Sequence, residues 1–366
     1  MTRPDTVAGH LLLVAGVVIV ATCLVLAAVI IVAKVVRARV LRATALRQAP
    51  LRPLVLAVAA GEDDDGTARA QLTAVPSSQR ADVRDLLVAL LSKVRGGPAE
   101  DLVAILGELR TVDAARESLH SRSAIRRARA ARVLGLMREE AYAADLVGAL
   151  ADRSPEVRLV AARALGMIGD PSAATAVLEA VRGTHGGVGI PASIAAEALI
   201  GMGVGVGPAL REALHADDAT MRAVAAGVAG VGLFTSTAPR LRVLLASDPD
   251  ERVRRTAAQA LGRLGGPGDV AVLVGSTHAD QPTPLRRVAA QALGELGDPS
   301  AVPALTALLV DEDRRLAQLS GQALAQLGPP GLRVLVEFAD GEGAVGRASR
   351  AALAVEELRA ASRRSA

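Results

Sequence analysis

The chain has 366 residues and carries only one Tyr and two Phe, with no Trp. Large enzyme cores use aromatic side chains as bulky filler, so this composition favours thin helices packed through alanine and leucine. The formal net charge is +4, but the excess positive charge lies within the first 48 residues, which argues against nucleic acid as the partner of the remaining chain. The single cysteine, Cys23, excludes an intrachain disulfide and fits a reducing compartment.

The first predicted element is a transmembrane helix over residues 11–33, after a short extracytoplasmic N-terminus at residues 1–10. Residues 11–33 carry no charge, and at about 1.5 Å per residue they can cross the ~30 Å hydrocarbon layer. A signal peptide is the alternative, but its apolar region is shorter and positive charge precedes it. Here the positive charge follows, which predicts a single-pass protein of the cell membrane with its N-terminus outside and the remaining chain in the cytoplasm.

The basic flank predicts a juxtamembrane helix over residues 34–50 that ends before Pro50. Its side chains lie where anionic lipid headgroups attract positive charge. The lipid-facing candidates are Lys34, Arg37, Arg39, Arg42 and Arg47.

Residues 51–95 predict a helical cap for whatever follows, because "LRPLVLAVAAG" and "RADVRDLLVALLSKV" each place apolar residues on one helix face. Between them, "GEDDDGT" is acidic enough to suggest calcium. With Gly66 at the sixth position of an EF-hand loop, the twelfth position is Leu72 rather than Glu. A solvated loop is therefore expected at residues 61–67.

A repeat of about 30 residues occupies residues 96–355. The repeat is marked by a Leu-Gly pair, and the glycine of this pair is here called the reference position. A weaker early copy of the repeat has its glycine at Gly107. The clear copies are at Gly135, Gly166, Gly201, Gly230, Gly262, Gly294 and Ala325. A glycine inside a helix costs about 1 kcal/mol relative to alanine, so its recurrence predicts a position where a side chain would clash with the neighbouring helix.

Each repeat predicts two amphipathic helices joined by a tight turn. In "GDPSA", Gly297 can end the first helix in the left-handed conformation, Asp298 can cap the next helix and Pro299 suits its first turn. A hairpin this small cannot bury its own apolar face, whereas a stack of hairpins can.

The pattern "VRxxAAxALGxLGDPxA" resembles the HEAT-repeat family, in particular the short bacterial kind named after phycobilisome lyases. The resemblance implies an all-α fold, a right-handed α-solenoid of seven to eight hairpins with the Leu-Gly helices on its concave side. The units at Gly201 and Gly230 are glycine-rich and depart from the pattern, so a bend or softer joint is expected there.

The resemblance also implies a ladder of charged side chains that ties neighbouring units together. Its acidic members are Asp152, Asp248, Asp280 and Asp311. Its basic members are Arg127, Arg158, Arg222, Arg254 and Arg286.

No catalytic or cofactor-binding constellation is apparent. The five histidines lack the His-Glu pairs on which HEAT-type di-iron hydroxylases depend, and no Cys/His cluster suits zinc. "GTHGGVG" lacks the context of a phosphate-binding loop. A basic cluster at residues 121–132 suggests nucleic acid, but aromatic side chains for base stacking are nearly absent. We therefore expect no cofactor, no metal and no nucleic acid.

The sequence favours a membrane-anchored, non-catalytic scaffold in the cytoplasm that binds a protein partner, such as a membrane-associated enzyme or transport complex. A HEAT-type lyase, or another enzyme auxiliary acting on a cofactor, is the alternative. The concave binding surface is expected at less apolar positions of the Leu-Gly helices, although these residues can equally be ordinary solvated ones. They are Arg132, Arg163, Arg255, Gln259, Arg287, Gln291, Gln318 and Gln322. The polar tail at residues 356–366 is expected to fray.

Overall fold

The computed structural model describes residues 24–36, 38–39, 42–91, 93–94, 96–109, 111–182, 189–266, 268–341 and 343–365. Every regular element among these residues is a helix, which confirms the predicted all-α class. The chain divides into two compact units, Met1–Asp113 and Ala114–Ala366.

The first unit is a small helical group. Its helices are α2 (Arg52–Ala60), α3 (Thr67–Thr73), α4 (Ser77–Leu91) and α5 (Gly97–Glu108). Val55, Leu72, Leu87 and Ile105 are buried in its core. The predicted cap at residues 51–95 therefore forms helices, but its boundary differs: α5 packs against α2 and α4 and belongs to this unit, not to the repeat array predicted to start at residue 96.

The acidic loop before α3 caps that helix. Asp63 accepts the backbone N–H of Ala68 at 2.8 Å and that of Arg69 at 2.9 Å. Asp65 accepts the backbone N–H and the hydroxyl of Thr67, and these hydrogen bonds hold the pKa of Asp65 below its usual value. The carboxylates thus satisfy free N–H groups at a helix start.

The described part of the chain before α2 is helical at residues 24–36, 38–39 and 42–48, and it turns at residues 49–50 as predicted. Within the described ranges, no helix is both long and apolar enough to cross a membrane. Residues 1–10, residues 11–23 of the predicted transmembrane helix, and Arg37 lie outside those ranges. Lys34, Arg39 and Arg42 are exposed, whereas Arg47 pairs with Asp82 of α4 at 3.1 Å.

The second unit is a row of helical hairpins, preceded by α6 (Thr111–Ser118). Seven hairpins are found among the described residues, in agreement with the repeat count from the sequence. They are α7 (Ala124–Met137) with α8 (Ala143–Ala149), α9 (Pro155–Ile168) with α10 (Ala174–Ala180), α11 (Ala192–Gly201) with α12 (Gly207–Ala213), α13 (Ala219–Val231) with α14 (Ala238–Ser247), α15 (Glu251–Leu264) with α16 (Asp269–Gly275), α17 (Thr283–Leu296) with α18 (Val302–Leu309), and α19 (Arg314–Gln326) with α20 (Pro329–Ala339).

The chain ends in α21 (Gly343–Ser365), which packs against α19 and α20. The tail expected to fray at residues 356–366 is therefore helical to Ser365. Its composition explains the difference, because alanine, arginine and glutamate are strong helix formers.

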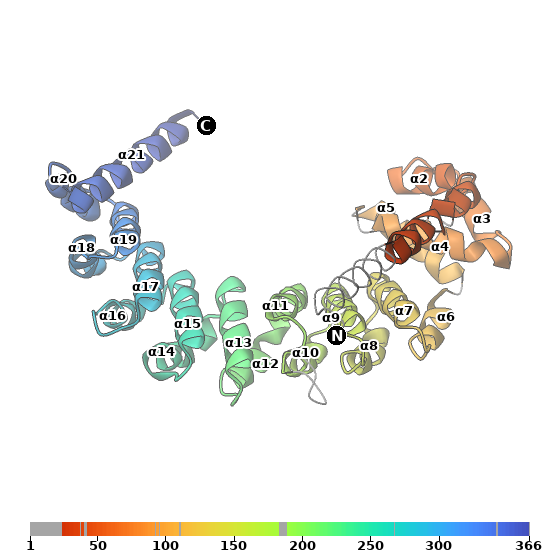
Figure 1. The fold of residues 1–366 in the computed structure, drawn as a ribbon, viewed down its shortest axis with the longest axis horizontal. Coiled ribbons are helices and arrows are strands. Elements are labelled where there is room, and N and C mark those ends of the chain that lie inside the picture. The colour runs from red at the N-terminus through yellow and green to blue at the C-terminus, as the bar shows by residue number, and fades with distance from the viewer. Residues whose placement is uncertain are drawn as a thin grey trace, which may run out of the picture. The chain divides into compact units, whose positions relative to one another are not determined.

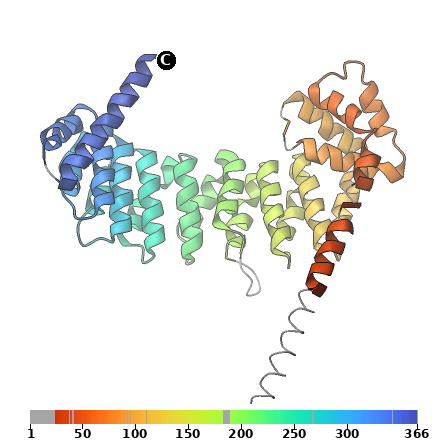
Figure 2. The same ribbon diagram turned by 45° about the horizontal axis from the view of Figure 1, so that its top comes forward.

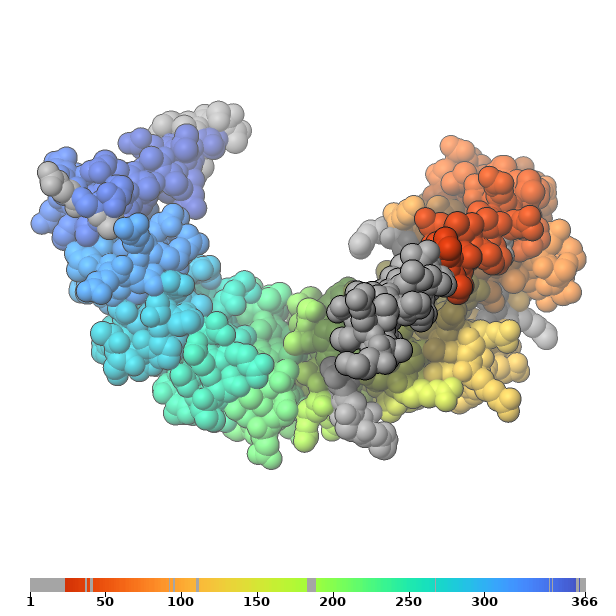
Figure 3. Space-filling view, viewed as in Figure 1, coloured from red at the N-terminus to blue at the C-terminus, as the bar shows by residue number. Residues whose placement is uncertain are grey.

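Within the second unit the hairpins stack side by side along a curve (Figures 1 and 2). The Leu-Gly helices α7, α9, α11, α13, α15, α17 and α19, here called the first helices, lie on the inner side of this curve, as expected. The partner helices of the hairpins, here called the second helices, lie on the outer side: α8, α10, α12, α14, α16, α18 and α20. The space-filling view shows the curve of the second unit continuing to its C-terminal end (Figure 3).

The recurring glycines lie where successive first helices touch. A Cβ on Gly135 would lie 2.5 Å from the Cβ of Ala164, and one on Gly262 would lie 2.7 Å from the Cβ of Ala292. Real Cβ atoms do not approach so closely. The predicted reason for these glycines is confirmed: a side chain would collide with the next helix.

The unit of α11 has a different register from the one predicted. In other units, the glycine of one first helix contacts an alanine of the next, namely Ala164, Ala260 or Ala292, which lies two residues before the reference position. Gly166 of α9 makes this contact with Ala198 of α11. The reference residue of α11 is therefore Ile200 and not Gly201. The glycine lies one residue late and faces back toward Gly166.

Candidate partner-binding surface

The charged ladder forms at the N-terminal ends of the first helices. Arg127 donates through Nε and Nη2 to both carboxylate oxygens of Asp152, at 2.6 and 2.8 Å. Arg222 makes the same paired contact with Asp248, at 2.7 and 2.9 Å, and Arg286 donates to Asp311 at 2.5 Å. Each arginine joins its own unit to the aspartate of the next unit, which confirms the ladder at three junctions.

Each ladder aspartate also orders the turn that follows it. Asp152, Asp248 and Asp311 accept the backbone N–H two residues further on, from Ser154, Asp250 and Asp313. Burial raises the pKa of Asp152, but the hydrogen bonds from Arg127 and Ser154 outweigh burial, so that the pKa lies below its usual value. The contacts of Asp152 therefore favour its charged form.

The fourth aspartate, Asp280, does not join the ladder as expected. The residue two positions on is Pro282, which has no N–H to donate. Asp280 is exposed, and Arg254 instead donates through Nη1 to the Asp248 carbonyl at 2.6 Å, while its buried Nε has no hydrogen-bond partner. The expected place of Asp280 in the ladder is therefore wrong.

The inner side of the second unit carries excess positive charge. On the first helices arginines outnumber acidic residues even when the five ladder arginines are left out. The acidic residues there are Glu156, Glu197, Glu251 and Glu295. The second helices are close to neutral, so a near-neutral array still has one basic face, here called the inner face.

The eight candidate residues all lie on first helices. Five are exposed: Arg132, Arg163, Gln259, Gln291 and Gln318. Three are half-buried: Arg255, Arg287 and Gln322. They lie on five of the seven first helices, α7, α9, α15, α17 and α19, and none of them lies on α11 or α13.

Some of these side chains also have structural partners. Arg287 donates to Asp313 at 2.5 Å, and Asp313 accepts the backbone N–H of Leu316 at the start of α19. The hydrogen bond from Arg287 lowers the pKa of Asp313. Arg287 therefore ties α17 to α19, a role that sequence spacing alone did not reveal.

Other contacts of the candidate surface are weaker. Arg163 lies 3.5 Å from Glu197, and Arg255 lies 3.6 Å from Glu251 on its own helix. Exposed pairs of this kind contribute little to stability, so both arginines remain accessible to a partner.

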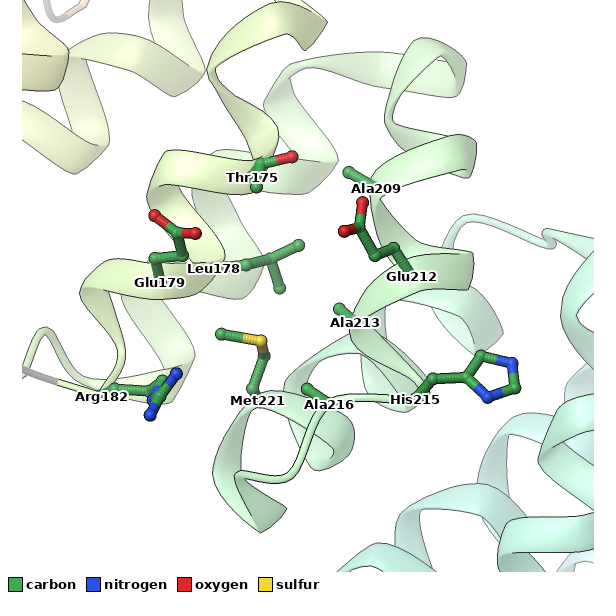
Figure 4. Close-up of a pocket in the computed structure, with 10 residues that line it drawn as sticks. All are labelled: Thr175, Leu178, Glu179, Arg182, Ala209, Glu212, Ala213, His215, Ala216 and Met221. Atoms are coloured by element: carbon green, nitrogen blue, oxygen red, sulfur yellow. The ribbon is translucent and has the colours of Figure 1, made fainter.

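A pocket that the sequence did not predict lies between α10 and α12 (Figure 4). Its volume is about 330 Å³, and Leu178 and Met221 point into it. Glu179, Arg182, Glu212 and His215 lie around it, but the imidazole of His215 points away. The polar groups do not converge on one point, as a catalytic site requires. No group of His, Cys, Asp and Glu able to hold a metal ion occurs among the described residues.

Comparison with known proteins agrees with this architecture. The family model described as HEAT repeats matches residues 112–199, 207–293 and 276–354, which together make up more than half of the chain. The chain belongs to the HEAT-repeat family. No curated protein sequence matches it significantly.

Solved structures show the same HEAT fold. A mutant of Kap121p aligns with a TM-score of 0.54 and 10% identity, over 81% of this chain and 37% of that one. The karyopherin Kap121p bound to the SUMO protease Ulp1p aligns with a TM-score of 0.51 and 10% identity, over 74% and 34%. The chain thus spans little more than a third of the length of Kap121p.

The CpcE–CpcF complex of the phycocyanin lyase from Nostoc sp. PCC7120 is also similar, with 21% identity over 69% of this chain and 92% of that one and a TM-score of 0.28.

Proposed function

We propose that this HEAT protein is a membrane-bound, non-catalytic scaffold whose inner face binds an acidic surface of a protein partner, such as a membrane-associated enzyme or transport complex. The observation that carries the proposal is the arginine excess on the first helices, which the curve of the second unit gathers on one side. Kap121p, which has the same fold, is known in a complex with the SUMO protease Ulp1p. A curved helical array therefore suits a protein ligand.

Reversing two inner-face charges tests this role. In Arg255→Glu with Arg263→Glu, we expect capture of the partner to fall at least tenfold, because rim charges of opposite sign attract and like charges repel. Arg287 is unsuitable for this test because it holds Asp313. Capture is measured by photocrosslinking in membranes from a crosslinker at Gln259, which is exposed on α15, followed by identification of the attached protein.

The matched control reverses two exposed arginines of second helices, Arg211→Glu with Arg333→Glu. The control should capture as much partner as the unchanged protein. Equal loss in both variants, or a crosslinked product that is RNA or a chromophore, contradicts the proposed function.

We further propose that residues 11–33 anchor the protein in the membrane, with the HEAT array in the cytoplasm. The described end of this stretch supports the proposal, because residues 24–36 form a helix whose apolar side chains are exposed on every side, from 46% for Val35 to 66% for Leu24. A helix that is apolar all round is stable in a protein core or in lipid. The basic side chains Lys34, Arg39 and Arg42 follow it directly and suit anionic headgroups.

Cell fractionation and a topology reporter test the anchor. The full chain should stay in the membrane fraction after washing with high salt, and a variant lacking residues 1–33 should move to the soluble fraction. A reporter active only in the cytoplasm should work when fused to Ala366. Activity of an exported reporter at that position would reverse the proposed orientation.

A further inference from the structure

The inner face of α13 lacks the positive charge of α15, the first helix that follows it. Its inner stripe consists of Thr220, Ala223, Gly227 and Val231, all uncharged. The equivalent stripe of α15 consists of Arg252, Arg255, Gln259 and Arg263. The middle of the basic inner face is therefore an uncharged strip with a floor of small side chains.

Exposed apolar side chains lie at the C-terminal end of this strip and at the C-terminal ends of the two preceding first helices, α9 and α11. Met167, Ile200 and Val231 are 39%, 45% and 50% exposed, and Val204 and Leu233 in the following turns are 85% and 61% exposed. We call these five residues the apolar patch. Successive packed helices lie about 8–10 Å apart, so three neighbouring helices present the apolar patch over about 20 Å. Exposed apolar surface of this kind marks interaction sites.

Leu233 departs from the HEAT pattern at a cost to the fold. Its φ is +55°, the left-handed conformation, in the turn where Gly169, Gly265 and Gly297 serve their own units. A branched side chain is strained in that conformation, whereas glycine is not. Leu233 is also mostly exposed, so it gains little from burial.

Gly227 is a second departure that the fold does not require. A Cβ there would lie 3.5 Å from Cγ2 of Thr256, an ordinary contact. The equivalent residues of α15, α17 and α19 are Gln259, Gln291 and Gln322. The packing around Gly227 therefore leaves room for a side chain, and the absence of one keeps the surface of the strip uncovered.

We infer that the strip on α13 and the apolar patch together dock an amphipathic helix of the protein partner, with an apolar stripe flanked by acidic residues. The small residues of α13 leave room for a helix, and the apolar patch supplies anchors for its stripe. Charge argues for acidic flanks: Arg129 and Arg132 on α7 are exposed on one side of the patch, and Arg255 and Arg263 on α15 lie on the other. Between them, the acidic side chain of Glu197 is exposed, with Arg163 3.5 Å away as a charge of opposite sign. The inference rests on the proposed function and names the partner's binding element.

Two substitutions that restore the chain's own repeat pattern test the inference. Gly227→Gln fills the strip with the residue found in three other units, and Leu233→Gly restores the turn glycine. The probe is a phage-displayed library of helical peptides, selected against the full chain in detergent micelles. We expect the selected peptides to carry an apolar stripe with acidic flanks, and each variant to bind them at least tenfold more weakly with an unchanged or higher midpoint of thermal unfolding.

Several outcomes would overturn the inference. Selected peptides with basic flanks, no selected peptides, or unchanged binding to both variants each exclude the proposed occupant. A lower unfolding midpoint for both variants would show that Gly227 and Leu233 serve the fold itself. If sedimentation shows that the apolar patch drives self-association, a second copy is the occupant. The two proposals can fail separately. If the Arg255 and Arg263 variant loses partner capture but the peptide experiment fails, the proposed function stands and only this docking site is excluded.

Discussion

Replacing Asp248 by asparagine should lower the free energy of unfolding by about 3 kcal/mol. The Arg222–Asp248 pair is the deepest rung of the ladder among the described ion pairs, with side chains 10% and 2% exposed. Asparagine keeps an oxygen for the N–H of Asp250 but leaves the Arg222 guanidinium buried without its opposite charge, and a buried, unpaired charge is costly. The measurement is the shift in urea-unfolding midpoint by circular dichroism.

The next unit supplies the control. Asp280→Asn changes the equivalent aspartate, which is exposed and does not hold Arg254. Its free energy of unfolding should stay within about 0.5 kcal/mol of the unchanged protein. Similar losses in the two variants would mean that the ladder does not stabilise the array through burial of paired charge.

Replacing Gly262 by alanine should destabilise the array by about 1–3 kcal/mol, although alanine is the better helix former. The new Cβ would lie 2.7 Å from the Cβ and 2.8 Å from the Cα of Ala292. Because the second contact is with the backbone of α17, a rotamer change cannot relieve it, and α15 must move away. The shift in urea-unfolding midpoint measures the loss.

Gly227→Ala is the matched substitution, also inside a first helix but 3.5 Å from the nearest side-chain atom. It should raise the free energy of unfolding by up to about 1 kcal/mol, the intrinsic preference of a helix for alanine. Stabilisation by both alanines would show that close helix packing does not explain the recurring glycines.

The repeat was predictable from the sequence because each unit packs only against its neighbours. The spacing of the Leu-Gly pairs reports local helix contacts, so it predicted the seven hairpins and the clash at Gly135 and Gly262. The ladder was predictable for the same reason. Its failure at Asp280 also had a visible signal, since Pro282 removes the N–H that the other ladder aspartates bind.

Other features depend on how separate helices meet, and sequence spacing does not contain that information. The register of α11 was misjudged because glycine was used as the marker; the Ala198–Leu199 pair, which aligns with Ala164–Leu165, was the better one. The Arg287–Asp313 pair and the pocket beside Met221 join different units. The left-handed backbone at Leu233 breaks the residue preference on which turn prediction depends.

The arginines of the inner face also bear on how fast a partner arrives. In physiological salt, a charge is felt over about 8 Å, which is comparable to the 8–10 Å between packed helices. The potentials of neighbouring first helices therefore overlap on the concave side of the second unit. Such a surface raises the association rate constant of an acidic partner more than it lengthens the lifetime of the complex, so binding to it is expected to be rapid, sensitive to ionic strength and readily reversed.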